Sequence, residues 1–228
     1  MKILRNIKHI VLGLSILVLW TGCNEDVTDF GFDGAISGVL KDAAGNIVAG
    51  DITSNTIVIK ALTEGDIVTT DIRVNGDGTY QNTKLYPKPT KIWITGPVTM
   101  TGDTLRVDFS ENSVVGHDFV VTPFITVKPP VLSGSASANS ITVNYEMMPN
   151  NGKVPNLREI YCSTNPYPNA STGSGPQYMT VKVSIPDNSG SKTISGLTSK
   201  TKYFIRVGAR ATGSSVLNYS EQIEVTTP

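Results

Sequence analysis

The sequence predicts an all-β fold made of two β-sandwich domains in tandem. From residue 34 onward, Val, Ile, Thr and Tyr recur in short alternating runs separated by Gly, Asn, Asp and Pro, which is the pattern of strands and turns. No long stretch shows the 3.6-residue period of an amphipathic helix, so we expect few helices. The chain has 228 residues, which is enough for two domains of common size.

The first residues have the order of a secretory signal. Basic side chains at Lys2, Arg5 and Lys8 precede an apolar run over residues 10–20, and small residues then lead to Cys23. The apolar run is about half the ~20 residues that a membrane-spanning helix needs. The segment resembles a bacterial lipoprotein signal, with a signal peptide over residues 1–22 and a lipid on Cys23. The alternative is an ordinary signal peptide that is cut elsewhere and leaves Cys23 unmodified.

The residues that follow Cys23 are polar and acidic. We expect residues 23–33 to form a lipidated tether, and the ten residues from 24 to 33, at ~3.3–3.6 Å each, reach at most about 35 Å. Acidic residues in this place resemble the export signal that sends lipoproteins of Bacteroidota to the outer face of the outer membrane. The resemblance implies an extracellular protein that acyl chains hold on the membrane. The alternative is a solvated tether that carries no address.

The charge and the cysteines exclude some classes of protein. The chain has 19 Lys and Arg and 19 Asp and Glu, and three of the basic residues but none of the acidic ones precede Cys23. The part after Cys23 is therefore net negative, and we expect no nucleic-acid partner, because that needs a basic surface. Cys162 is the only other cysteine, so no disulfide can form within the chain once Cys23 is acylated.

Residues 34–128 are expected to form the first sandwich. Leu105, Val107 and Phe109 alternate with polar residues, which predicts a strand with one buried and one solvated face. The sequence Asn-Gly-Asp-Gly at residues 75–78 is a strong turn signal. Strands are predicted at residues 35–41, 56–62, 67–74, 79–86, 91–95, 104–110 and 113–122.

A pair of prolines marks the boundary with the second domain. Pro129 and Pro130 favour stiff, extended backbone, so we place the boundary between residues 128 and 129 and expect two docked or semi-rigid domains. In the second domain, residues 129–228, the run 140–147 has its apolar residues at alternate positions. Further strands are predicted at residues 157–163 and 179–185.

Short motifs in both domains resemble known modules. The spacing within residues 196–203, where Gly-Leu precedes Thr201 and Tyr203, resembles the tyrosine corner of a fibronectin type III domain. In such a corner the phenol hydroxyl ties a strand to the preceding loop. In the first domain, residues 38–45, 77–80 and 85–87 are similar to prealbumin-like domains, which resemble the regulatory modules of carboxypeptidases.

The signal and the two sandwiches together resemble a Bacteroidota family of two-domain surface lipoproteins of unknown function. The resemblance is strongest over residues 74–96 and 118–127. Members of that family are encoded beside SusC-like transporters and SusD-like lipoproteins, which import glycans or peptides. The resemblance therefore implies an accessory role in nutrient capture, with those two proteins as partners and a glycan or a peptide as ligand. It implies no chemistry.

The sequence offers little that points to catalysis. His9 leaves with the signal peptide, and His117 shares strand parity with apolar residues, so neither is expected to act as a base. No nucleophile elbow, zinc-ligand spacing or phosphate loop occurs. Residues 75–78 fit a hairpin turn better than a calcium loop, because Arg73 and Asn82 stand where calcium ligands are needed. We expect no enzyme, metal or cofactor, and a hydrolase with paired carboxylates is kept as an alternative.

The best candidates for ligand binding are aromatic residues. Tyr167 and Tyr178 lie in or beside a long loop over residues 164–177 that is rich in Pro and Gly, and Tyr161 precedes it. Aromatic rings on a rigid frame stack well on sugar faces. The alternative is a surface loop that a tyrosine holds in place. Trp93 is a further candidate, which could equally contact the second domain.

One modification and one function complete the expectations. Asp103-Thr104-Leu105 matches a short acceptor pattern for O-glycosylation in these bacteria, with Thr104 as the acceptor. The sequence is interpreted as a non-catalytic, lipid-anchored accessory of a SusC/SusD-type importer in the outer membrane. The alternatives are a structural spacer that docks on the transporter, and a glycan hydrolase or peptidase with an unrecognised site.

Overall fold

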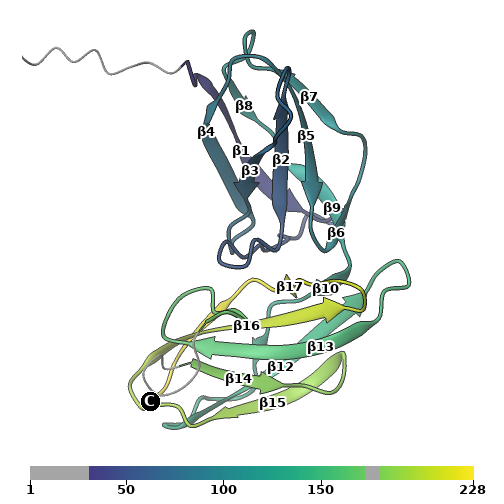
Figure 1. Ribbon diagram of the computed structural model, residues 1–228. Coiled ribbons are helices and arrows are strands. Elements are labelled where there is room, and N and C mark those ends of the chain that lie inside the picture. The colour runs from purple at the N-terminus through teal and green to yellow at the C-terminus, as the bar shows by residue number, and fades with distance from the viewer. Residues whose placement is uncertain (1–30, 173–179) are drawn as a thin grey trace, which may run out of the picture. The chain divides into compact units, whose positions relative to one another are not determined.

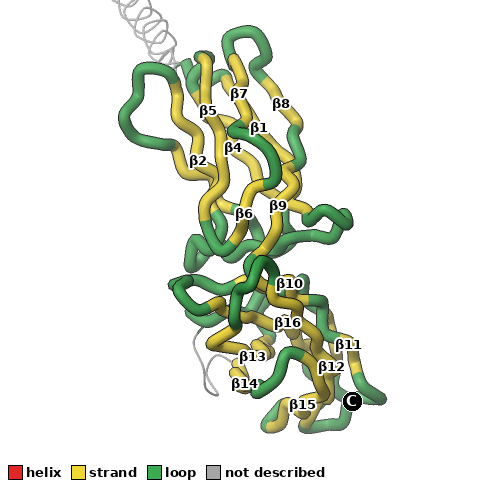
Figure 2. Tube along the Cα trace, turned by 90° about the vertical axis from the view of Figure 1, so that its right-hand side faces the viewer, coloured by secondary structure: helices red, strands yellow, loops and turns green. Residues whose placement is uncertain are grey.

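A computed structural model describes residues 31–172 and 180–228 of the chain (Figures 1 and 2). Residues 33–228 form one compact unit. Every helix or strand assigned in the described residues is a β-strand, which confirms the predicted all-β class. No helix in these two ranges is long and apolar enough to cross a membrane.

The first sandwich consists of two facing sheets. One sheet has the strand order β4-β1-β9-β6, with β8 also paired to β1, and the other has the order β3-β2-β5-β7. Side chains from both sheets form one core around Ile36, Ile59 and Ile92. The strands are β1 (Gly34–Lys41), β2 (Val58–Thr63), β3 (Thr70–Arg73), β4 (Thr79–Leu85), β5 (Pro89–Thr95), β6 (Val98–Met100), β7 (Leu105–Asp108), β8 (Val114–Gly116) and β9 (Phe119–Pro123).

Three details of this sandwich differ from the predictions. The predicted strand over residues 113–122 is two strands, because the Asp118 carboxylate accepts from Val39 N (2.9 Å) and Lys41 Nζ (2.6 Å) and interrupts the ladder. The strand predicted from residue 67 begins only at Thr70, after an exposed turn. Strand β6, which pairs with β9, was not predicted.

The second sandwich also has two sheets. β12 carries β10, β11 and β15, while β13 and β16 pair at the centre of the other sheet, with β14 on β13 and β17 and β18 on β16. Its strands are β10 (Ile125–Val127), β11 (Val131–Leu132), β12 (Ser140–Pro149), β13 (Pro155–Ser163), β14 (Thr180–Ser184), β15 (Ser189–Ser195), β16 (Lys202–Ala211), β17 (Asn218–Tyr219) and β18 (Ile223–Thr226). Together the two domains confirm the predicted tandem of sandwiches.

The tyrosine corner is present in the second sandwich. Tyr203 is buried at the start of β16, and its hydroxyl accepts a hydrogen bond from Thr198 N at 2.9 Å. The phenol thus ties the strand to the loop before it, as the resemblance implied. The alternation predicted for β12 also holds, because Ile141 and Tyr145 are buried in the second core.

The boundary between the sandwiches lies before the two prolines. β10 pairs with β12, and Ile125 is fully buried in the second core. The second sandwich therefore begins at Ile125 and not after residue 128, which corrects the predicted boundary. The prolines instead separate β10 from β11, both of which pair with β12.

Candidate functional site

The described part of the loop after β13, residues 164–172, contacts the first sandwich. The ring of Tyr167 lies against Gly76 in the turn before β4, where an added Cβ would lie 2.2 Å from Tyr167 Cδ1. Tyr167 N donates to Gln222 Oε1 at 2.6 Å, and its φ of 53° is unusual for a residue other than glycine. Ser171 Oγ is 2.9 Å from Ser54 Oγ of the first sandwich. The loop therefore helps to join the two domains, and 39% of Tyr167 remains exposed.

Tyr161 is not available to a ligand. Its exposed fraction is 0%, and it lies in a small cluster with Ala49, Leu217 and Tyr219. The prediction that Tyr161 is a ligand-binding ring is therefore wrong. Strand alternation does place the ring on the face of β13 opposite Ile160, but the first sandwich covers that face here through Ala49.

Arg206 is the largest fully buried side chain at this junction. It stands on β16 with an exposed fraction of 0%, and its guanidinium carbon lies 3.9 Å from the centre of the Tyr219 ring. Its Nε donates to Pro168 O at 2.6 Å, and its Nη1 donates to Gly50 O of the first sandwich at 3.4 Å. One guanidinium thus binds the loop and the neighbouring domain together.

Asp51 supplies a buried carboxylate from the first sandwich to the same cluster. Its Oδ1 accepts from Asn169 Nδ2 at 3.0 Å, a bond that crosses the junction. Burial lowers the pKa of Arg206, and the neighbouring Tyr219 and Asp51 raise it. A buried cation needs such neighbours, because an uncompensated charge inside a protein costs several kcal/mol.

The tyrosines of the cluster are held neutral. Burial raises the pKa of Tyr219 to about 12, and its hydroxyl accepts from Ala170 N at 3.0 Å. Burial also raises the pKa of Tyr161, whose hydroxyl donates to Glu159 Oε2 at 2.6 Å. Neutral phenols can pack against a guanidinium without adding a second charge, so they suit this position.

A second set of contacts joins the sandwiches around β17. Asn218 Nδ2 donates to Pro97 O of the first sandwich at 3.0 Å, and its Oδ1 accepts from Ile125 N at 3.1 Å. Ala49 of the first sandwich pairs with Tyr219 in an isolated antiparallel bridge. The junction is thus held by backbone pairing as well as by side chains.

A cleft opens beside these contacts, with walls from both sandwiches. Its volume is about 540 Å³, within the range of small-molecule sites, which often lie at domain interfaces. The lining residues are Asp42, Ala44, Asn46, Ile47, Val48, Pro123, Ile125, Thr126, Val127, Lys128, Pro129, Val131, Met148, Asn218, Tyr219 and Glu221.

The cleft combines polar and apolar groups. Asp42 and Asn46 come from the turn after β1, and Glu221 comes from the segment after β17. Burial raises the pKa of Asp42, but hydrogen bonds from Asn46 and backbone amides outweigh it and place the pKa below its usual value. Met148, which is 52% exposed, and Val131 supply apolar surface on the other wall.

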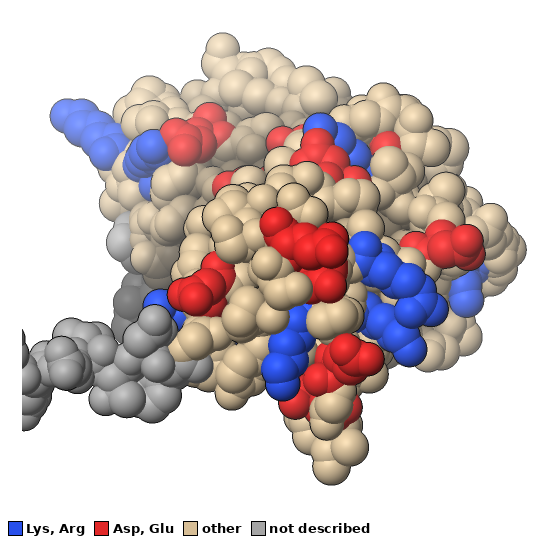
Figure 3. All heavy atoms as spheres, turned by 90° about the horizontal axis from the view of Figure 1, so that it is seen from above, with Lys and Arg blue, Asp and Glu red and all other residues tan. Residues whose placement is uncertain are grey.

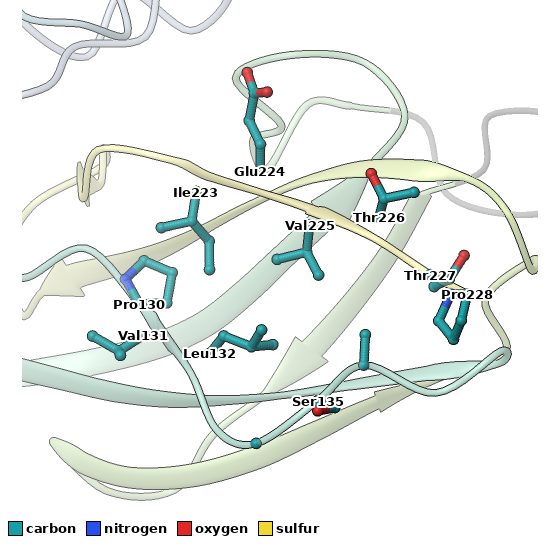
Figure 4. Close-up of a pocket in the computed structure, with 12 residues that line it drawn as sticks. Pro130, Val131, Leu132, Ser135, Ile223, Glu224, Val225, Thr226, Thr227 and Pro228 are labelled. Carbon is teal, nitrogen blue, oxygen red and sulfur yellow. The ribbon is translucent and has the colours of Figure 1, made fainter.

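A second hollow lies along the edge of the second sandwich (Figure 4). It is an open groove of about 830 Å³ between β11 and β18. Ile223 and Val225 point into the groove toward Pro130 and Leu132, while Glu224 points away. Val131 lines both this groove and the cleft.

The other predicted residues are not brought to the cleft. Trp93 is half-buried on β5 and lies opposite Lys60 of β2, while Thr104 is exposed just before β7. Neither lines the cleft, and both predictions remain untested. Cys23 and Tyr178 lie outside the described residues.

His117 and Cys162 both pack against neighbouring groups of the sandwiches. His117 is half-buried with its ring edge against Phe119, at 4.6 Å between ring centres. Cys162 is buried in the second core, and burial raises the pKa of its thiol to about 12. No group of three or more His, Cys, Asp or Glu within residues 31–172 and 180–228 is arranged to hold a metal ion. On the face shown in Figure 3, acidic and basic side chains are interspersed.

The sequence did not reveal the buried cluster. Arg206 alternates outward between Ile205 and Val207, so the pattern alone makes it a solvated side chain. It is buried because the loop and the first sandwich cover the outer face of β16. The sequence feature that could have indicated a covered face is a pair of aromatic residues, because Tyr161 and Tyr219 stand on that same face.

The fold is similar to those of three solved bacterial structures. A DUF3823 family protein from Bacteroides ovatus matches with a TM-score of 0.66 and 18% identity, over 86% of this chain and 99% of that chain. Another from Parabacteroides merdae matches with a TM-score of 0.67 and 14% identity, over 85% and 98%. A "putative carbohydrate binding protein" from Bacteroides uniformis matches with a TM-score of 0.65 and 18% identity, over 86% and 100%.

At these identities the likeness establishes the fold and leaves the function to the site. The matches cover nearly the full length of each relative, so the pairing of two sandwiches is common to all of them. No family model matches the sequence, and no curated protein matches it.

Proposed function

We propose that this chain is a non-catalytic surface protein that captures a carbohydrate in the cleft between its two sandwiches. The observation that carries the proposal is the cleft itself, about 540 Å³ in volume, with walls that buried hydrogen bonds hold in place. A similarly folded protein from Bacteroides uniformis is described as a putative carbohydrate binding protein, which supports this ligand class.

The groups in the cleft suit a sugar. A sugar ring presents hydroxyl groups at its rim and C–H groups on its faces, so its site needs both hydrogen-bonding and apolar surface. Asn46 and Glu221 offer amide and carboxylate groups from two segments, while Met148 and Val131 offer apolar surface. A preformed cleft also lowers the entropy that binding costs, because little has to be ordered when the ligand enters. A peptide is the alternative ligand.

Binding to purified full-length protein in detergent tests this proposal. A panel of immobilised glycans should retain the protein, and Glu221→Ala combined with Met148→Ala should weaken retention at least tenfold. Both side chains are exposed, so these changes should leave the fold intact. Trp93→Ala is the matched control, since Trp93 does not line the cleft. Retention that depends on Trp93 and not on the cleft would refute the cleft as the site.

The lipid attachment and the cellular location are part of the same proposal. We propose that Cys23 carries lipid and that the protein is held on the extracellular face of the outer membrane. It would be a member of the Bacteroidota family of surface lipoproteins, with a prealbumin-like first domain and a fibronectin type III-like second domain. Labelling cells with an alkyne fatty acid should mark the wild type and not Cys23→Ala. Protease added to intact cells should then degrade the labelled protein.

The proposed partners are a SusC-like transporter and a SusD-like lipoprotein. The short predicted tether supports a position close to the membrane. Affinity purification from the native host should recover both partners, and recovery of neither would exclude the accessory role.

A structural spacer is the second candidate function. It is favoured by the loop over residues 164–172, which joins the two sandwiches. Affinity purification of such a spacer would recover the transporter, but the protein would bind no glycan or peptide.

A further inference from the structure

Three buried side-chain atoms near the junction make no hydrogen bond to another protein atom. They are Asp51 Oδ2, Thr56 Oγ1 and Arg206 Nη2. Asp51 is 4% exposed, Thr56 is 1% exposed and Arg206 is 0% exposed, so bulk solvent does not reach them. Buried polar groups in proteins are nearly always satisfied, and leaving one unpaired is unfavourable. These atoms therefore call for a partner.

The two charged groups complement each other but do not touch. Arg206 Nη2 is a donor and Asp51 Oδ2 is an acceptor, and Arg206 Nη1 donates to the carbonyl of Gly50, the residue before Asp51. No direct ion pair within 4.0 Å joins the two side chains. Each group already has other bonds that fix its place: Asp51 Oδ1 accepts from Thr53 N at 3.0 Å and from Asn169 Nδ2, and Arg206 binds two carbonyls.

We propose that one internal water molecule lies between Arg206 Nη2 and Asp51 Oδ2 and completes an ionic bridge between the two sandwiches. The water accepts a hydrogen bond from the guanidinium and donates one to the carboxylate. A buried water needs two to four polar partners, and Thr56 Oγ1, from the same segment as Asp51, is available as a third. No other ligand is needed to satisfy the pair.

The bridge makes the two sandwiches one cooperative unit. Asp51 belongs to the segment before β2 of the first sandwich, and Arg206 stands on β16 of the second. Separating the domains breaks the bridge and returns a cation and a carboxylate to solvent on the two sides. Removing one member of a buried charge pair is strongly destabilising, whereas replacing both by neutral groups is far less so. The effects on stability of mutating Arg206 and Asp51 should therefore be strongly non-additive.

A double-mutant cycle on the full-length protein tests the bridge. Arg206→Met and Asp51→Asn should each raise the equilibrium constant of unfolding by about two orders of magnitude or more. The double variant should be at least tenfold more stable than the product of the two single effects predicts. Additive effects would overturn the proposal. If Arg206→Met fails to fold, Arg206→Gln replaces it in the cycle, because glutamine removes the charge and keeps an N–H donor.

An exposed ion pair on the same sheet gives the matched control. Lys202 of β16 pairs with Glu224 of β18, and both side chains are 53% exposed. A cycle with Lys202→Met and Glu224→Gln should show a coupling of less than about threefold, because solvent screens such pairs. Equal coupling in the two cycles would remove the case for a special bridge.

A crystal structure that shows ordered water tests the occupant. A peak within about 2.7–3.2 Å of both Arg206 Nη2 and Asp51 Oδ2 is expected. That peak should be absent when Arg206 and Asp51 are both replaced. A direct Arg206–Asp51 contact with no peak between them would contradict the water, and the mutant cycle would then report a direct ion pair.

Discussion

The two sandwiches meet in two different ways. Around Arg206 the junction is closed, because a guanidinium and a carboxylate are buried there and the Tyr167 loop is bonded across it. In the cleft beside it, the domains stand apart, and exposed side chains such as Met148 and Glu221 line the space. The closed part can fix the width of the open part. This division of roles lets a ligand site form between two domains without depending on the ligand to hold them together.

The largest expected effect comes from opening the closed part. Tyr161→Ala removes a fully buried ring from the junction cluster and should lower the free energy of unfolding by about 3–5 kcal/mol. Met148→Ala removes a side chain from the cleft and should change it by less than about 0.5 kcal/mol. Urea unfolding of both variants measures the contrast. Equal losses would mean that the two parts of the junction do not differ.

The contact between Tyr167 and Gly76 can be broken by a substitution at Gly76 in the first sandwich. Gly76→Ala places a Cβ where the Tyr167 ring lies, so it should displace the loop and destabilise the protein by about 1–3 kcal/mol. Gly116→Ala is the control, because open space surrounds Gly116. The loop over residues 164–172 should become sensitive to protease only in Gly76→Ala. An unchanged cleavage pattern would show that Tyr167 does not hold the loop.

A bond inside the second sandwich separates domain stability from junction stability. Tyr203→Phe removes the acceptor for Thr198 N and should destabilise the protein by about 1–2 kcal/mol. Because this bond lies away from the junction, the loop over residues 164–172 should remain protected from protease under native conditions. Increased cleavage of that loop would show that the corner and the junction are coupled.

The smallest expected effect is on the acid side of the pH profile. The hydrogen bond from Lys41 holds the pKa of Asp118 below its usual 3.8. A carboxyl with a lowered folded-state pKa adds stability above its unfolded pKa and loses it as the pH falls through its folded pKa. The loss of stability below about pH 4 should therefore be slightly smaller in Asp118→Asn.

The pair is exposed, so the effect should be a small fraction of the wild-type stability. Urea midpoints measured from pH 6 to pH 2.5 would detect it. Parallel profiles for the two proteins would exclude a role for this carboxyl in acid stability.

Much of the fold could be read from local patterns in the sequence. Alternation predicted β7 and β12, and the resemblance to a tyrosine corner implied that Tyr203 binds the preceding loop, where Thr198 is its partner. These features depend on residues that are close in sequence. The break at Asp118 could not be predicted, because its carboxylate binds β1, which is 77 residues or more away in the chain.

The site could be predicted only in part, for the same reason. Tyr161, Tyr167 and Arg206 lie on faces that a lone sandwich would expose, so their sequence patterns resemble those of binding or surface residues. The burial of Tyr161 and Arg206 and the contact made by Tyr167 depend on Ala49, Gly50 and Gly76 in the other domain. The cleft likewise combines the turn after β1 with β10, β12 and β17, a grouping that only the docked domains create.

Glycan binding by the cleft is the most direct test of the account. Calorimetric titration of the full-length protein with the glycan that retains it should give one site for each chain. We expect the combined Glu221→Ala and Met148→Ala variant to lose at least tenfold in affinity while keeping its unfolding midpoint. Full affinity in that variant, or no binding by the wild type to any glycan of the panel, would contradict the account.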